Sequence, residues 1–210
     1  ELKLPPAEPP KLDSAAGGVG QSGRPDLSFA KARTLRVVGR DHSNATIGVT
    51  TAFDNLSKLV GAPMHGNLGY AWLKDWRMVL DWPARRLRLE TSRGDLPGSE
   101  AMTVAPKKPL VVTAIWINGQ GPFQAVFDTG AGMNLVAPSL AERLRLVTTD
   151  AVDVHGVAGV SKGNRTRLQT LKVGGLELKQ VDAVQSAAVD QVAELAGADI
   201  VAVLGRSLME

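Results

Sequence analysis

The sequence predicts an all-β protein that contains two copies of one module, and three observations support this fold class. Glycine occupies 22 and proline 12 of the 210 positions, and many short runs rich in valine, leucine and isoleucine lie between them. This pattern is typical of strands joined by tight turns. The helix signals are short, and part of the first half recurs in the second half. A chain of this length can form one large or two small domains.

Two β-hairpins are predicted along the chain. The first joins Trp76–Trp82 to Arg86–Glu90 through a three-residue turn that begins with proline. The second joins Leu110–Ile117 to Phe123–Phe127. Its turn, the Asn-Gly-Gln-Gly run from Asn118, supplies residues that accept positive φ angles.

Two short helices and a linker complete the predicted elements. Pro138 and Ser139 precede a two-turn helix over 140–144, in the order expected of a helix start. A second helix is predicted over Ala187–Leu195, closed by Gly197. Residues 91–106 are polar and contain two glycines and two prolines, which is typical of a linker.

An internal repeat sets the domain organisation. Leu35–Leu73 aligns with Leu171–Met209 without a gap, at a constant offset of 136. Identical residues across this offset indicate one module present twice. Their first-copy members are Leu35, Val37, Gly39, Ala52, Asp54, Leu59, Gly61, Ala62, Leu68 and Gly69. We expect residues 1–90 to be the last part of a first lobe, 91–106 a linker, and 107–210 a second lobe.

The start of the first copy is expected to lie outside this sequence. Glu1–Leu4 resembles Arg143–Leu146, the end of the short helix, at an offset of 142. The chain begins without methionine and ends directly after an apolar run. We therefore expect a fragment, with the first lobe truncated at its start and the second at its end.

Composition excludes several function classes. The sequence has no cysteine, which excludes disulfide frameworks, thiolate metal sites and cysteine nucleophiles. The histidines, His42, His65 and His155, are too scattered to predict a metal site. The net charge is +3, but the basic residues are dispersed and only 4% of residues are aromatic, so no nucleic-acid partner is expected. No run approaches the roughly 18 apolar residues of a membrane span.

A glycine-rich segment near the start does not predict a cofactor. Gly18–Gly23 has the letters of a dinucleotide-binding loop. That loop requires an aliphatic strand before it and a helix after it. Neither is predicted here, and Arg24-Pro25-Asp26 follows where the helix should begin. We expect no cofactor.

The strongest chemical signal is an acid at the end of an apolar strand. Gln124–Phe127 leads directly into Asp128-Thr129-Gly130-Ala131, and Asn134-Leu135-Val136 follows. A carboxylate in such a position is costly unless it is used. Thr129 could anchor the turn through its hydroxyl, and Gly130 permits a bend that points amides at the carboxylate. The pattern indicates an acid/base site.

This segment resembles the active-site loop of pepsin-like and retropepsin-like aspartic proteases. The resemblance extends to Val201–Arg206, which looks like the strand that crosses beside that loop, and Gly66–Leu89 resembles the closing part of a lobe. It implies acid-protease-like lobes, a polypeptide substrate and catalysis by Asp128. It further implies supporting roles in the active loop for Thr129, Gly130, Ala131 and Gly205.

The family chemistry uses two aspartates that share a proton and activate the water between them. Asp13 is a poor partner for Asp128, because prolines precede it and Ala15 stands in the glycine position. The repeat offset instead places the partner upstream of Glu1, so this fragment alone is expected to be inactive. Small residues are expected in substrate-binding flaps: Gly156, Val157, Ala158 and Gly159 in the second copy, and Gly17 and Gly18 in the first.

Two alternatives remain open. The chain could be a non-catalytic peptide-binding protein on the same fold, with one aspartate lost. It could also work as a retropepsin-like homodimer through the Asp128 lobe, although a two-lobe parent does not need to dimerise. Resemblance to bacterial members favours a periplasmic or secreted location.

Overall fold

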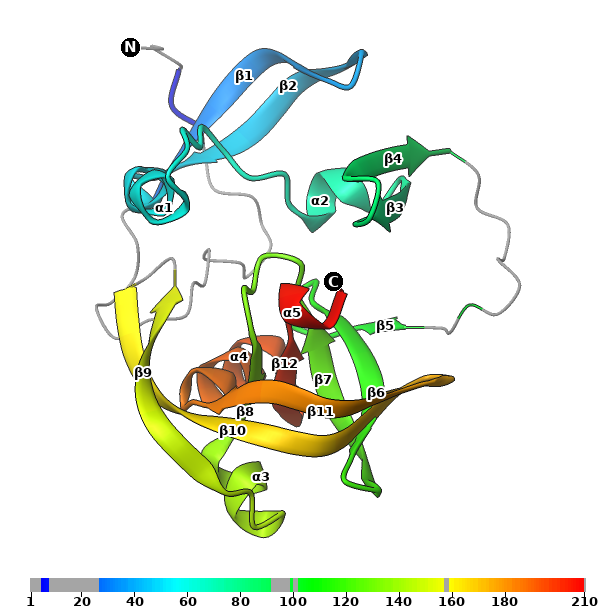
Figure 1. The fold of residues 1–210 in the computed structure, drawn as a ribbon. Coiled ribbons are helices and arrows are strands. Elements are labelled where there is room, and N and C mark those ends of the chain that lie inside the picture. The colour runs from blue at the N-terminus through cyan, green and yellow to red at the C-terminus, as the bar shows by residue number, and fades with distance from the viewer. Residues whose placement is uncertain (1–4, 8–26, 92–98, 100–101, 157–158, 210) are drawn as a thin grey trace. The chain divides into compact units, whose positions relative to one another are not determined.

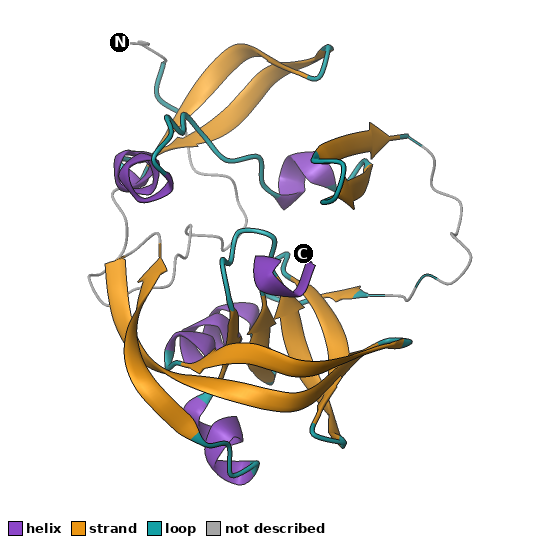
Figure 2. Ribbon diagram, in the orientation of Figure 1, coloured by secondary structure: helices purple, strands orange, loops and turns teal. Residues whose placement is uncertain are grey.

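The computed structural model describes residues 5–7, 27–91, 99, 102–156 and 159–209 (Figure 1). The chain divides into two compact units. One comprises Glu1–Gly66 with His155–Val160, and the other Asn67–Val154 with Ser161–Glu210. Strands make up most of the regular structure and the helices are short (Figure 2). The all-β prediction is confirmed.

Residues 27–66, the main described part of the first unit, form one hairpin and one helix. Strands β1 (Ser28–Val37) and β2 (Arg40–Val49) pair antiparallel. Val38 and Gly39 form the turn with φ angles of 49° and 75°. Helix α1 (Ala52–Val60) follows and ends at Gly61, whose φ of 69° is the left-handed conformation that closes many helices.

The second unit begins with a short helix and the first predicted hairpin. Helix α2 spans Tyr70–Leu73. Strands β3 (Arg77–Asp81) and β4 (Arg86–Glu90) pair antiparallel, with Leu80 opposite Leu87. The predicted hairpin is confirmed.

The rest of the second unit is organised around one eight-stranded sheet. The sheet runs in the order β5-β6-β7-β12-β8-β11-β10-β9. An additional β6–β10 pairing, in which Leu171 lies opposite Ile117, closes six of these strands into a ring. The strands are β5 (Thr103–Val104), β6 (Val111–Ile117), β7 (Gln120–Phe127), β8 (Asn134–Val136), β9 (Thr148–Gly156), β10 (Gly159–Val173), β11 (Leu176–Gln185) and β12 (Ile200–Leu204). The helices are α3 (Pro138–Arg143), α4 (Ala188–Ala196) and α5 (Arg206–Met209).

Of the elements predicted from local sequence signals, the β6–β7 hairpin, α3 and α4 are present in this unit. Asn118 and Gly119 form the β6–β7 turn with φ angles of 50° and 76°, and α3 and α4 lie where they were predicted. Strand β5 falls inside the range interpreted as a linker. It pairs with β6, with Thr103 opposite Val112. The end of that range is therefore part of the sheet.

The core of the second unit lies inside the strand ring. Side chains with almost no exposure come from strands far apart in the sequence, and α4 adds Val189 at 0% exposure. The largest of them are Ile115, Ile117, Leu168, Leu171 and Leu204. Such burial contributes roughly 1.5–3 kcal/mol per large aliphatic side chain. The strands that flank the Asp128 loop are therefore anchored in a well-packed core.

The sequence repeat is also a repeat of structure. At the offset of 136, β2 corresponds to β11, α1 to α4 and α2 to α5, residue for residue. Both hairpins contain a positive-φ residue at the same point, Asn44 in one and Gln180 in the other, with φ angles of 53° and 54°. Residues 64–68, the counterparts of β12, form no strand. In the second copy β12 pairs with β7 and β8.

Candidate active site

Strand β7 delivers Asp128 to the end of the packed sheet. Ala125 and Val126 are buried at 0% and 3% exposure, and the strand then emerges so that Asp128 is exposed. Strand β12 runs parallel to β7, with Leu204 opposite Phe127. The amide of Asp128 donates to the carbonyl of Leu204 at 2.9 Å. The backbone at Asp128 is therefore anchored while its side chain faces solvent.

The backbone turns back onto the carboxylate directly after Asp128. The amide of Gly130 donates to Oδ1 of Asp128 at 2.8 Å, and the amide of Ala131 donates to the Asp128 carbonyl at 3.2 Å. A Cβ on Gly130 would lie 3.2 Å from the same Oδ1. Gly130 thus provides clearance, and its φ is outside the left-handed region. The expected amide-to-carboxylate bend is present.

Thr129 plays a different part from the one expected. Its side chain is exposed. Within the part of the chain that the structure describes, no hydrogen bond from its hydroxyl anchors the turn. The bend is instead closed by the backbone amides of Gly130 and Ala131.

Gly205 passes close beside this loop, at the end of β12. A Cβ on Gly205 would lie 2.7 Å from the carbonyl oxygen of Ala131 and 2.8 Å from the carbonyl carbon of Met133. The next amide, that of Arg206, donates to the Ala131 carbonyl at 2.7 Å. This approach is possible only because residue 205 has no side chain.

Asn134 joins the loop to two strands, a role the sequence analysis missed. Its side chain is buried at 2% exposure. Its Oδ1 accepts from the amide of Gly205 at 3.0 Å, and its Nδ2 donates to the carbonyl of Asp182 at 3.1 Å. The available signal was an amide side chain directly before Leu135 and Val136, since a buried polar group needs partners.

The comparison with protein families decides the assignment of this region. Residues 113–208 match the model of a family described as aspartyl protease. This segment of the chain is therefore similar to the aspartyl protease family. Among solved structures, one similar chain is a retropepsin-like aspartic protease from Rickettsia conorii. The sequence identity is 17%, the match covers 51% of this chain and 74% of that chain, and the TM-score is 0.35. The curated proteins contain no match to this chain.

The aspartyl protease segment includes part of the expected flap. Gly156 ends β9 and Gly159 begins β10, and these two strands are neighbours in the sheet. Val157 and Ala158 between them lie outside the described residues. Gly17 and Gly18 also lie outside them. The flap roles of all six glycine, valine and alanine positions stay predictions.

A groove of about 1120 Å³ lies in the second unit and includes the active loop of the protease segment. Asp128, Thr129 and Gly130 line it together with apolar side chains such as Phe127 and Leu208. Asp128 is the one carboxylate among the described residues that line the groove. A single carboxylate beside an apolar surface suits binding of a peptide but supplies only half of an aspartate pair.

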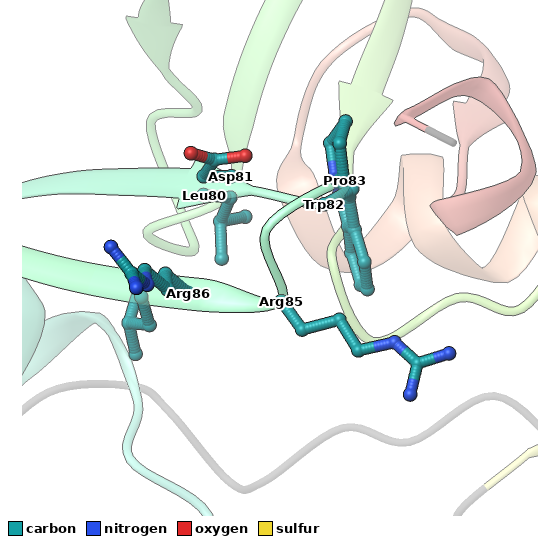
Figure 3. Close-up of a pocket in the computed structure, with 7 residues that line it drawn as sticks. Leu80, Asp81, Trp82, Pro83, Arg85 and Arg86 are labelled. Carbon is teal, nitrogen blue, oxygen red and sulfur yellow. The ribbon is translucent and has the colours of Figure 1, made fainter.

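A second cavity, of about 630 Å³, lies at the β3–β4 turn outside the protease segment (Figure 3). Figure 3 shows the Asp81 carboxylate and the Arg85 guanidinium pointing in different directions. Oδ1 of Asp81 accepts from the amide of Ala84 at 3.1 Å. Asp81 therefore caps the turn.

The described residues contain no group of three or more histidine, cysteine, aspartate or glutamate side chains placed to hold a metal ion. They also contain no helix with the length and apolar character needed to cross a membrane.

Proposed function

We propose that the parent protein hydrolyses peptide bonds with a water molecule activated by two aspartates, of which Asp128 is one. The observation that carries this proposal is the exposed Asp128 carboxylate in a bend closed by the Gly130 amide, 2.8 Å from Oδ1, inside a segment similar to the aspartyl protease family. No covalent intermediate is needed, because the nucleophile is water.

The chemistry requires a second carboxylate. One aspartate must be ionised to accept a proton from the water, while the other must be protonated to donate to the carbonyl oxygen of the substrate. Two carboxyl groups about 3 Å apart share one proton because both cannot ionise. The single carboxyl group of Asp128 cannot be ionised and protonated at the same time.

The partner aspartate is proposed to come from a homologous lobe of the same protein. Residues 28–73 repeat β11, α4 and α5 of the second copy with the same bounds, and both hairpins carry a positive-φ residue at the same point. Subtracting the offset of 136 or 142 from 128 places the counterpart of Asp128 about eight or fourteen positions before residue 1. The helix offset of 142 is the nearer anchor, so fourteen is favoured.

The test is hydrolysis of a peptide library by the full-length parent, followed by mass spectrometry. Asp128→Asn is compared with Asp81→Asn. Both substitutions keep an oxygen acceptor for the local amide, Gly130 for one and Ala84 for the other. Cleavage abolished by Asp128→Asn and retained by Asp81→Asn supports the proposal. Parental rates in the Asp128→Asn protein would overturn it.

A separate experiment tests whether the second aspartate comes from the same chain or from a second copy of it. An Asp-Thr-Gly or Asp-Ser-Gly triplet in the gene within about twenty residues upstream of Glu1, together with activity per chain that is independent of concentration, supports two lobes in one chain. Activity per chain that rises with concentration, with dimers in sedimentation, indicates a homodimer through the Asp128 lobe. Peptide binding without cleavage, and a different upstream triplet, would indicate a binding protein.

A further inference from the structure

We propose that Asn134 is a positioning residue that sets the place of the Asp128 loop. This inference rests on the proposed function for its catalytic consequence, but its structural part stands independently. Asn134 does not touch the Asp128 carboxylate. It acts through the backbone of Gly205, which lies 71 residues away in the chain.

Three hydrogen bonds join the active loop to the end of β12. Two are made by backbone atoms alone: Asp128 amide to Leu204 carbonyl at 2.9 Å, and Arg206 amide to Ala131 carbonyl at 2.7 Å. The third runs from the Gly205 amide to Oδ1 of Asn134 at 3.0 Å. Only this third bond depends on a side chain. Asn134 is therefore the residue whose side chain takes part in the hydrogen bonding of this junction.

The environment of Asn134 leaves its amide one orientation. The Gly205 amide can only donate, so it requires the oxygen, and the Asp182 carbonyl can only accept, so it requires the NH₂ group. The Gly205 amide belongs to a buried residue, and the Asn134 side chain is buried at 2% exposure. Loss of the side chain would remove the partner of the buried Gly205 amide, which is costly.

Glycine at 205 increases the importance of this bond. Since no Cβ separates Gly205 from the carbonyls of Ala131 and Met133, the strand and the loop are in direct backbone contact. A glycine is also the residue with the widest choice of backbone conformations. The Asn134 side chain holds that flexible point in the conformation that allows the contact. Displacement of Gly205 would move the Ala131 end of the bend that orients Asp128.

The expected consequence is a loss of turnover rather than of substrate binding. A misplacement of about 1 Å at a reacting group can lower the rate about 100-fold. Asn134 is buried beneath the loop and is not among the residues that line the groove. For Asn134→Leu in the full-length parent we expect kcat to fall about 10- to 100-fold while KM stays within about threefold.

Thr166→Val is the matched control. Thr166 is also buried, at 5% exposure, and its hydroxyl donates to the Val147 carbonyl at 2.9 Å. Its removal deletes one buried bond from side chain to backbone in the same unit, away from the Asp128 loop. We expect this variant to lose stability with kcat per folded molecule unchanged. Equal kcat losses in the two variants would overturn the positioning role.

Hydrogen exchange provides a readout independent of catalysis. In Asn134→Leu the amides of Gly205 and Gly130 should exchange at least about tenfold faster, while Asn118, whose amide donates to Thr170 at the far end of the β6–β7 hairpin, should be unchanged. If Asn134→Leu does not fold, Asn134→Ala carries the same expectations without added bulk. Unchanged exchange at Gly205 and Gly130 would overturn the inference. A parent that cleaves no peptide would overturn the proposed function, and the exchange data would still decide whether Asn134 holds the loop.

Discussion

The amide nitrogen of Gly130 lies 2.8 Å from Oδ1 of Asp128, so the residue two places beyond the acid determines where its carboxylate points. A hydrogen bond from a neutral amide to a carboxylate is charge-assisted and stronger than one between neutral groups. Among the described residues, none donates a hydrogen bond to the other oxygen of this exposed carboxylate. The bend thus presents one oriented carboxylate at the end of β7.

Asp128→Asn in the full-length protein should preserve the fold and abolish peptide hydrolysis. Asparagine keeps the shape and an oxygen that can accept from Gly130, but it has no proton to exchange with water. The measurement is the initial rate of cleavage alongside a thermal unfolding curve. A matching unfolding midpoint with the rate reduced to background is the expected result. A rate equal to that of the parent would exclude Asp128 from the reaction.

Gly130→Ala should reduce kcat about 10- to 100-fold while leaving the protein folded. Its Cβ would lie 3.2 Å from Oδ1 of Asp128, so the carboxylate must shift by a few tenths of an ångström. Gly132→Ala is the control in the same loop, because a Cβ there meets nothing within 4 Å. Steady-state kinetics of the two variants check this prediction. Equal kcat values would show that clearance at Gly130 is unimportant.

Gly205→Ala should lower the free energy of unfolding by about 1–3 kcal/mol, the usual cost of overpacking a buried site. The added Cβ would lie 2.7 Å from the Ala131 carbonyl oxygen, and backbone cannot move aside as a flexible side chain can. Urea denaturation measures the change. The control is Gly175→Ala, where a Cβ meets nothing within 4 Å. The prediction would fail if both variants unfolded at the same urea concentration as the parent.

The β1–β2 hairpin offers a prediction on pH. Arg36 and Asp41 are direct cross-strand partners, and Nη2 of Arg36 lies 2.7 Å from Oδ2 of Asp41. This hydrogen-bonded guanidinium lowers the pKa of the Asp41 carboxyl. A lowered carboxyl pKa adds stability that is complete above the ordinary value of about 3.9 and is lost as pH falls through the lowered value.

NMR titration of the Asp41 carboxyl in the parent and in Arg36→Gln measures this shift. We expect the Asp41 pKa to rise in the variant, because glutamine carries no charge. Both side chains are largely exposed, so the effect on overall stability should be small and should weaken with added salt. An unchanged Asp41 pKa would contradict the prediction.

Local chemistry in the sequence predicted part of the fold and singled out Asp128 as the candidate site residue. Asn118 and Gly119 predicted the β6–β7 turn because they accept positive φ, and Gly197 predicted the end of α4 for the same reason. The repeat offset predicted matching elements, and the structure contains three such pairs with identical bounds: β2 and β11, α1 and α4, and α2 and α5. Asp128 stood out because an acid directly after an apolar strand is costly unless it is used.

Other features depended on residues brought together from distant parts of the chain. Thr103 and Val104 carry a weak strand signal and become β5 only because the edge of β6 offers backbone partners. The β6–β10 pairing that closes the ring joins Ile117 to Leu171. Asn134 acquires its role from Gly205 and Asp182, 71 and 48 residues away. Turn conformations and apolar periodicity are properties of neighbouring residues, so the sequence by itself determined them. Pairing across the sheet depends on which distant backbone groups the fold brings within hydrogen-bonding distance of one another. Only the tertiary structure decided it.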